Sequence, residues 1–248
     1  SSLDTLLQKA GAFLKPFVPQ LQTTFLKSLH DASSEVREKA AGNLGELAKL
    51  TLRIDQLMKD LLSTAETCSS EVKEACVIAL GEVVSNGPKA KLSASVVTQV
   101  GSTLRGIEDD EDESNAVQKR AAYSLGQYGA SCSGDELATL VDHICGEQSV
   151  SRMITLNALL QRAFANLQGA GLFARCVQEI KKNGKSKESD IKVKVAEACG
   201  TVLLQEAAEA LEGGEGAGGD LPSLSQVLPC LVSLLDPKGN NSSEVLMT

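Results

Sequence analysis

A short pattern recurs five times along the chain. The segment 35–47 reads EVREKAAGNLGEL, the segment 71–83 reads EVKEACVIALGEV, and the segment 116–128 reads AVQKRAAYSLGQY. Weaker copies follow at 150–162 and 191–203. An internal period of about 40 residues constrains the fold more than any single motif does, because each repeat must be one small unit that stacks on the next. The first apolar residues of the five copies are Val36, Val72, Val117, Val150 and Ile191.

Each copy has the apolar spacing of an α-helix. Apolar residues stand four and eight positions after the first one, as Ala40 and Leu44 do after Val36, and this spacing places them on one helix face. A glycine costs about 1 kcal/mol relative to alanine inside a helix. Its recurrence at the next position therefore predicts a close approach by a neighbouring helix. The glycines in question are Gly45, Gly81, Gly126 and Gly200.

A further amphipathic segment precedes each copy, so the sequence predicts an all-α fold built from helix pairs. Two helices in about 40 residues are typical of HEAT or armadillo units. The pairs Val36-Arg37 and Val72-Lys73 favour HEAT, and Asp31, six residues before Arg37, is expected to form a structural turn pair with it. The preceding helices are expected at 17–30, 54–66, 93–106, 136–146 and 172–182.

These units are expected to stack into a right-handed superhelical solenoid of about five full helix pairs, since one pair cannot bury its own apolar face. The whole chain, 1–248, is interpreted as one segment of a longer solenoid, with partial repeats at both ends. The segment 2–13 is interpreted as the second helix of an earlier repeat, and 243–248 as part of the last one. The predicted repeats are 17–50, 54–86, 92–130, 135–168, 172–211 and the truncated 221–248.

Composition excludes several functional classes. A net charge of −8 disfavours sequence-specific nucleic-acid binding and attachment to anionic membranes. The seven cysteines are odd in number and contain no CxxC, so neither a disulfide framework nor a zinc site is expected. They are interpreted as buried thiols of a cytoplasmic protein. No apolar stretch approaches the roughly 20 residues that span a bilayer.

Two of the predicted turns carry concentrated charge. The third turn reads EDDEDE at 108–113, and the fifth reads KKNGKSKESD at 181–190. Each has a simple interpretation as a solvated loop and a functional one as a contact for a partner of opposite charge. With helices packed about 8–10 Å apart, the two turns are expected on one ridge, roughly 20 Å apart. The candidate contact residues are Asp109, Asp110, Glu111, Asp112, Lys181, Lys182, Lys185 and Lys187.

The sequence offers no catalytic constellation, cofactor motif or metal site. It contains two histidines, His30 and His143, and neither GxSxG nor HExxH. Cys145 stands two residues after His143, which places the two on different helix faces. The Gly-rich stretch 212–220 lacks the GK[ST] ending of a phosphate-binding loop and is interpreted as a flexible link. A non-enzymatic recognition surface is therefore expected.

The first repeat carries a family resemblance. The segment 13–47, which begins FLKPFVPQLQTTF, resembles the C-terminal HEAT region of the general control non-derepressible translational activator family. The similarity continues through RIDQLMKDLL at 53–62 and then by repeat order. Within the opening motif, Pro16 is expected to end one helix and Pro19 to lie in the first turn of the next. Phe17 is expected to pack against that second helix as a hydrophobic staple.

The resemblance implies a function that periodicity does not. It implies a non-catalytic scaffold segment of a ribosome-associated activator of the kinase that phosphorylates translation initiation factor two alpha, in amino-acid starvation and stalled-ribosome signalling. The partners it implies are the RWD domain of that kinase and the ribosome or a ribosome-bound cofactor. Two alternatives stay open: a karyopherin-like transport receptor segment, which usually uses Trp and Asn arrays absent here, and a purely structural spacer.

Overall fold

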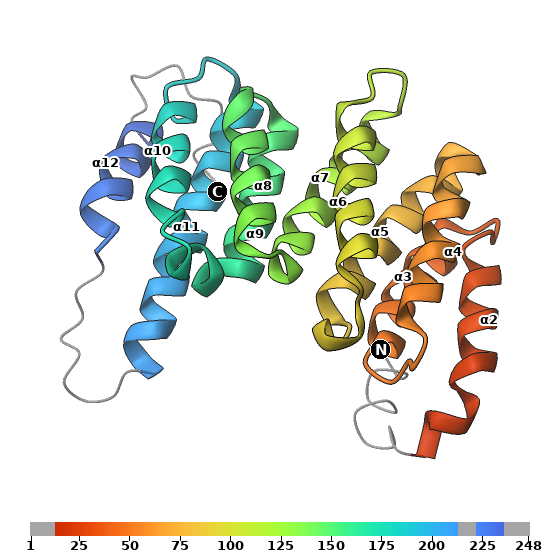
Figure 1. The fold of residues 1–248 in the computed structure, drawn as a ribbon. Helices are drawn as coiled ribbons and strands as arrows, with labels where there is room; N and C mark the ends of the chain where they lie inside the picture. Colours follow the sequence, from red (N-terminus) through yellow and green to blue (C-terminus); the bar gives the residue numbers. More distant parts are fainter. Residues whose placement is uncertain (1–12, 213–221, 236–248) are drawn as a thin grey trace. The chain divides into compact units, whose positions relative to one another are not determined.

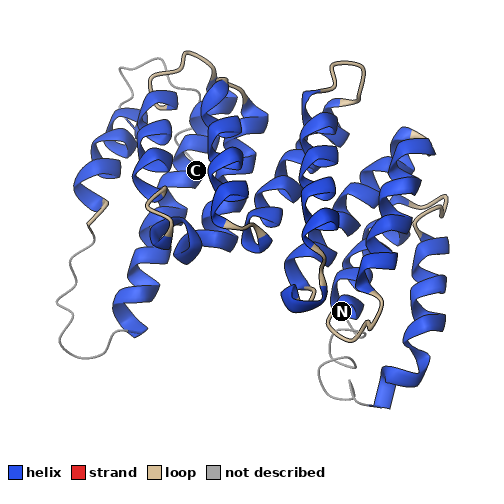
Figure 2. Cartoon of the chain, viewed as in Figure 1, coloured by secondary structure: helices blue, strands red, loops and turns tan. Residues whose placement is uncertain are grey.

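The computed structural model describes residues 13–212 and 222–235. Within these residues all regular structure is helical, as Figure 1 and Figure 2 show, so the all-α class predicted from the sequence is confirmed. The chain divides into two compact units, Ser1–Cys132 and Ser133–Thr248, and each is described by itself. The prediction that all repeats form one solenoid domain with the boundaries given above stays a prediction.

The described part of the first unit, residues 13–132, contains three helix pairs. In each pair the first helix packs on the second, and the second helices α3, α5 and α7 pack side by side in one row. Short 3₁₀ turns join some of these elements. The elements are η1 (Lys15–Phe17), α2 (Val18–Ser28), α3 (Ser34–Ala48), α4 (Ile54–Thr67), α5 (Ser70–Asn86), η2 (Lys89–Lys91), α6 (Ala94–Asp109), α7 (Asn115–Tyr128) and η3 (Gly129–Ser131).

In the second unit, the described residues 133–212 and 222–235 form two helix pairs and one further helix. Helix α8 packs on α9, α10 packs on α11, and α9 contacts α11 in the same way as second helices do in the first unit. Helix α12 lies against both α10 and α11. The helices are α8 (Gly134–Gly146), α9 (Val150–Gly169, interrupted by non-helical dihedral angles at Ala163), α10 (Phe173–Asn183), α11 (Ser189–Glu212) and α12 (Leu224–Leu235).

Serine residues start several of these helices. The side chains of Ser114, Ser133 and Ser149 each accept a hydrogen bond from a backbone N–H in the first turn of α7, α8 and α9. At α8 the Glu136 carboxylate also accepts from the Ser133 backbone N–H, which completes a capping box. These caps satisfy N–H groups that have no partner inside the helix, and they fix where each helix begins.

The apolar stripe predicted for the second helices forms the core. Leu44 on α3, Leu80 on α5 and Leu125 on α7 are fully buried, and Val195 on α11 is buried in the same manner. Other predicted stripe positions are less covered: Val72, Val150 and Ile154 are half-buried, and Val36, near the start of α3, is exposed. Among described residues, no helix is both long enough and apolar enough to cross a bilayer.

The glycines predicted at close helix contacts differ from one another. A Cβ atom at Gly45 would lie 2.5 Å from Glu82 Cβ, and one at Gly81 would lie 2.6 Å from Ser124 Oγ. Both distances are far below van der Waals contact, so these two positions confirm the predicted close approach of α3 to α5 and of α5 to α7. A Cβ atom at Gly200 on α11 would meet nothing within 4 Å, so at this position the prediction is wrong.

The proline corner differs in part from its prediction. Pro19 is the second residue of α2, as expected, but Pro16 lies within η1, which leads directly into α2. Phe17 is 55% exposed, so the predicted hydrophobic staple is wrong. A hydrophobic staple requires an extended residue before the helix, because that residue turns the side chain back onto the first turn. Phe17 instead has helical dihedral angles, so its side chain is not turned back in this way. The small core at this end instead joins Val18 and Leu47, with Leu14, Leu21, Phe25 and Leu50 packed against them.

Three predicted features lie outside the described residues. These are the earlier helix at 2–13 except for its last residue, the flexible link at 212–220 except for its first, and the partial helix at 243–248.

Candidate protein-contact turns

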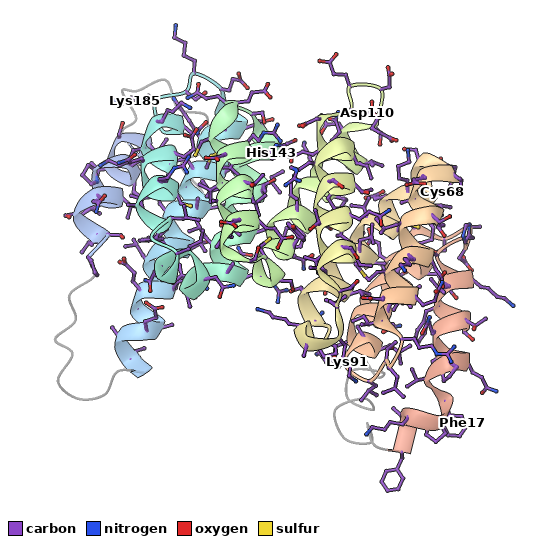
Figure 3. All side chains as sticks on the ribbon, viewed as in Figure 1. Phe17, Cys68, Lys91, Asp110, His143 and Lys185 are labelled. Carbon is purple, nitrogen blue, oxygen red and sulfur yellow. The ribbon has the colours of Figure 1, made fainter. Side chains whose placement is uncertain are left out.

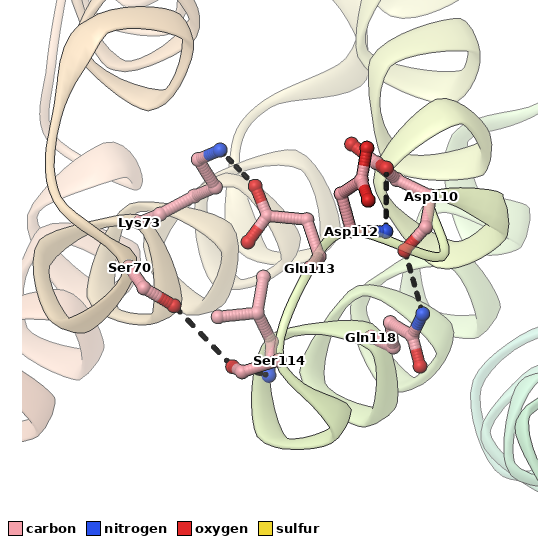
Figure 4. Close-up of polar contacts among 8 residues, drawn as sticks. Ser70, Lys73, Asp110, Asp112, Glu113, Ser114 and Gln118 are labelled. Atoms are coloured by element: carbon pink, nitrogen blue, oxygen red, sulfur yellow. Dashed lines mark hydrogen bonds and ion pairs between the residues drawn. The ribbon is translucent and has the colours of Figure 1, made fainter.

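The acidic turn lies between α6 and α7 in the first unit. Asp109 is the last residue of α6, and Asp110, Glu111 and Asp112 follow it as exposed residues. The turn is locally ordered, because the Asp112 backbone N–H donates to Asp110 Oδ1 at 3.1 Å. Gln118 Nε2 on α7 donates to the Asp110 carbonyl oxygen at 2.6 Å (Figure 4). The exposed carboxylates are therefore held on a defined loop.

The next carboxylate in the same run behaves differently. Glu113 forms an ion pair with Lys73 on α5, and the two side chains are only 11% and 20% exposed (Figure 4). Beside this pair the hydroxyl oxygens of Ser70 and Ser114 lie 3.3 Å apart. Glu113 therefore attaches the turn to the preceding repeat. Sequence reasoning missed this role, since the six consecutive acidic residues are chemically alike and the pattern does not show which one turns inward.

In the first and third repeats, the residue after the first apolar position braces the turn that precedes it. Arg37 donates to the backbone carbonyl oxygens of Asp31 at 2.9 Å and of Ala32 at 3.1 Å. The predicted turn pair is thus joined through the main chain of Asp31, whose carboxylate accepts from the Ser33 backbone N–H at 2.9 Å. Gln118 occupies the equivalent position in the third repeat and also bonds a turn carbonyl. An amide performs the same bracing as a guanidinium there.

A polar row crosses the second helices of the first unit. Arg120 on α7 donates to Glu74 on α5 at 3.1 Å and to Glu38 on α3 at 3.0 Å, so one side chain joins three repeats. Gln127 also donates to Glu82 at 2.9 Å between α7 and α5. Much of the charge on this face is therefore paired within the row.

The basic turn follows α10 in the second unit. Lys181 and Lys182 are the last charged residues of α10, and the Lys182 ammonium lies 3.1 Å from the buried carboxylate of Glu179. Asn183 donates to that carboxylate as well, at 2.8 Å. Of the four predicted lysines, Lys182 is thus neutralised by its own helix. The exposed Lys181, Lys185 and Lys187 have no carboxylate within ion-pair distance among the residues that the structure describes.

The basic turn borders a cavity of about 260 Å³ on one side of α12. Lys181 and Lys185 line it from the turn (Figure 3 labels Lys185), and Lys187 does not. The acidic and basic turns belong to different units, so their predicted spacing stays a prediction. A further hollow, of about 530 Å³, lies beside α2 and α4 and is lined by Val18, Pro19, Leu52 and Arg53 among others. Sequence reasoning predicted neither hollow.

Comparison with known proteins extends these observations to a family. The HEAT repeat model matches residues 21–51, which contain the braced turn of Asp31 and Arg37. The chain is 27% identical over 253 aligned residues to Protein ILITYHIA of Arabidopsis thaliana, across 99% of this chain. It is 33% identical to the human Stalled ribosome sensor GCN1 across 56% of this chain, and 32% identical to the Saccharomyces cerevisiae eIF-2-alpha kinase activator GCN1 across 72%.

A solved structure supports the fold. The match to a crystal structure of importin beta covers 98% of this chain and 32% of the importin beta chain, with a TM-score of 0.51 and 16% sequence identity. At that identity the match supports a fold of stacked helix pairs, and it indicates nothing about binding of transport cargo. The chain spans 9%, 5% and 7% of the lengths of the Arabidopsis, human and yeast relatives. Helix pairs, a HEAT match and these relatives agree with the resemblance of the opening motif, and the chain belongs to the GCN1 family, as a stretch of its HEAT-repeat region.

Proposed function

We propose that the chain is a non-catalytic, cytoplasmic scaffold segment of a ribosome-associated activator of the kinase that phosphorylates translation initiation factor two alpha. It acts through protein–protein contacts in amino-acid starvation and stalled-ribosome signalling. The similarity to relatives named Stalled ribosome sensor GCN1 and eIF-2-alpha kinase activator GCN1 carries this proposal. The partners are the RWD domain of the kinase and the ribosome or a ribosome-bound protein.

The distribution of charge supports a binding role for the turns. Polar side chains such as Arg120 and Lys73 are engaged in contacts between repeats. Glu111 and Asp112 in one unit, and Lys185 and Lys187 in the other, instead point their charges at solvent. Exposed charges raise the rate and selectivity of association with a partner of opposite charge more than they stabilise a fold. A stack of helices held by internal polar contacts suits a scaffold.

The transport-receptor alternative has weaker support. The chain is 16% identical in sequence to importin beta, and the likeness between the two extends to the fold alone. The sequence also lacks tryptophan entirely, whereas that class uses tryptophan and asparagine arrays to hold cargo. Binding to a nuclear localisation peptide, measured with the chain immobilised, would favour this alternative over the proposal.

Two binding assays with the 248-residue chain test the proposal. In the first, the immobilised RWD domain of the kinase is expected to retain the chain, and absence of retention would contradict the kinase contact. In the second, the chain is expected to sediment with ribosomes through a sucrose cushion at low salt and to be released as ionic strength rises. A chain that binds neither partner would leave the spacer interpretation as the better one.

A further inference from the structure

The cavity beside the basic turn contains a thiol as well as lysines. It is lined from the turn by Lys181, Gly184 and Lys185, and from α12 by Pro229, Cys230 and Ser233 among others. Cys230 is half-buried, so its sulfur is accessible from the cavity while part of the side chain is covered by protein. A cationic hollow with an accessible sulfur suits a small anionic molecule that reacts with thiols.

A glycine and a proline shape this space. Gly184 has no Cβ, and a Cβ there would lie 2.4 Å from Cys230 Sγ, so the sulfur rests directly on the glycine backbone. Pro229 lies inside α12 and lacks the N–H that would bond the carbonyl of Ser225. Ser225, Pro229 and Ser233 recur at every fourth residue and therefore share the α12 face that borders the cavity.

Cys230 has another thiol as its neighbour. Cys199 on α11 is fully buried and forms a hydrogen bond with Cys230 across the contact between α11 and α12. That bond from the Cys199 thiol lowers the pKa of Cys230, burial acts in the opposite direction, and the charge of Lys181 lowers it further. The same hydrogen bond, together with burial, raises the pKa of Cys199. Between the two thiols, this contact therefore favours ionisation of the accessible Cys230 over that of the buried Cys199.

Four other thiols have the opposite character. Burial raises the pKa of Cys76 in the first unit and of Cys176 in the second to about 12. Burial also raises the pKa of Cys68 and of Cys145. These thiols stay protonated near neutral pH and are poor nucleophiles, since the thiolate is the reactive form. They provide internal controls within the same molecule.

We propose that Cys230 and Cys199 form a redox-active dithiol pair that undergoes exchange with a small anionic disulfide of the glutathione class in this cavity. The Cys230 thiolate attacks one sulfur of the small disulfide, the S–S bond of that molecule breaks, and one small thiolate leaves. Cys199 then gives its proton to solvent and attacks the Cys230 sulfur, and the other small thiolate leaves. The protein gains one disulfide between α11 and α12, and the small disulfide is reduced to two thiols.

The lysines of the basic turn have a defined part in this exchange. Lys181 stabilises the attacking thiolate, and Lys181 and Lys185 both line the space that the carboxylates of the small molecule would enter. Lys187 lies in the same turn and does not line the cavity, so it serves as a matched control. This chemistry is independent of which protein partner the chain binds.

The first test uses the unmodified 248-residue chain and needs no variant. The chain is treated with a limiting amount of iodoacetamide at pH 7, and alkylation of each cysteine is followed by peptide mass spectrometry. Cys230 is expected to react at least about tenfold faster than Cys176 and Cys145, since each unit of pKa changes the thiolate fraction about tenfold. A Cys230 that reacts no faster than these thiols would overturn the proposal.

The other test follows the exchange itself. With oxidised glutathione, the wild-type chain is expected to yield a peptide cross-linked between Cys199 and Cys230, and Cys199→Ala is expected to stop at the mixed disulfide on Cys230. Lys181→Gln is expected to slow the first step severalfold, while Lys187→Gln leaves it unchanged; circular dichroism checks that each variant is folded. A wild-type chain that stays reduced, or that accumulates the mixed disulfide with Cys199 still free, would contradict the pair.

Discussion

The acidic turn between α6 and α7 and the basic turn after α10 carry concentrated charge of opposite sign, and they differ in how those charges are paired. In the acidic turn, Glu113 pairs with Lys73 of the preceding repeat, and Gln118 bonds the carbonyl of Asp110. In the basic turn, Lys182 is neutralised by Glu179 of its own helix. The acidic turn is thus fixed to a neighbouring repeat by one of its charges, whereas the ion pair of the basic turn lies within one helix.

This difference shows that, within a run of like charges, the residues paired inside the protein must be separated from the exposed ones before the run is given a function. Lys73 and Glu113 are largely buried, so their role is to join repeats. Glu111 and Asp112, and Lys185 and Lys187, are exposed and stay available to a partner. This distinction is tested first by substitution of Lys73 and Glu113, which join two repeats, and then by substitution at helix contacts that differ between the two units.

Removal of one joining charge is expected to have the largest effect. Lys73→Ala leaves the Glu113 carboxylate largely buried without its partner. Such losses cost about 3–5 kcal/mol for fully buried pairs and under about 1 kcal/mol for exposed ones, so we expect about 2 kcal/mol of unfolding free energy here, measured by urea denaturation.

A matched control is available on α3. Lys39 pairs with Glu35 at 2.6 Å, and both side chains are well exposed, so Lys39→Ala should leave the urea midpoint unchanged. The double variant Lys73→Met with Glu113→Leu removes both charges and should recover much of the lost stability. Equal midpoints for Lys73→Ala and Lys39→Ala would show that the acidic turn is not held in the way described.

The glycines of the second helices provide the next contrast between the units. Gly81→Ala would place a methyl group 2.7 Å from Ser124 Cβ, so the α5–α7 contact must separate, at an expected cost of about 1–3 kcal/mol. Gly200→Ala on α11 meets open space and should instead stabilise the chain by up to about 1 kcal/mol through helix propensity. Thermal unfolding of the two variants measures this opposite sign, and a shift of the same sign in both would contradict the assigned packing.

The row at Arg120 is expected to give the smallest effect. Its side chain is 44% exposed and its partners Glu38 and Glu74 are 52% and 28% exposed, so Arg120→Ala should cost about 1 kcal/mol or less. High salt should reduce the difference between variant and wild type, since exposed pairs are screened. If the cost proved large and independent of salt, the row would be a buried structural element and not a surface network.

The fold followed from the sequence more completely than the site did. A fixed four-residue spacing buried Leu44, Leu80 and Leu125, because side chains four apart share a helix face whatever their partner. Phe17 was misplaced since its environment depends on dihedral angles that the motif does not encode. Gly200 shares its sequence position with Gly81, yet the space around it is set by the neighbouring helix.

The candidate site required side-chain contacts between residues far apart in the chain. Glu113 lies 40 residues from Lys73, and nothing in EDDEDE distinguishes it from Glu111. The cavity at the basic turn is lined both by Gly184, which follows α10, and by Pro229 of α12, and no local pattern predicts that these residues border one space. The sequence predicts Cys199 and Cys230 only as buried thiols, and their contact depends on the packing of α11 against α12.

The most direct test of the central claim compares binding after charge reversal at exposed positions in the two units. The triple variant Lys181→Glu, Lys185→Glu, Lys187→Glu is measured against Lys89→Glu with Lys91→Glu, which reverses exposed charges in the first unit, for RWD-domain retention and ribosome sedimentation. We predict that the triple variant stays folded and loses at least about tenfold in affinity for one of these partners, with the control unchanged. Unaltered binding of the triple variant to both partners would contradict a contact role for the basic turn.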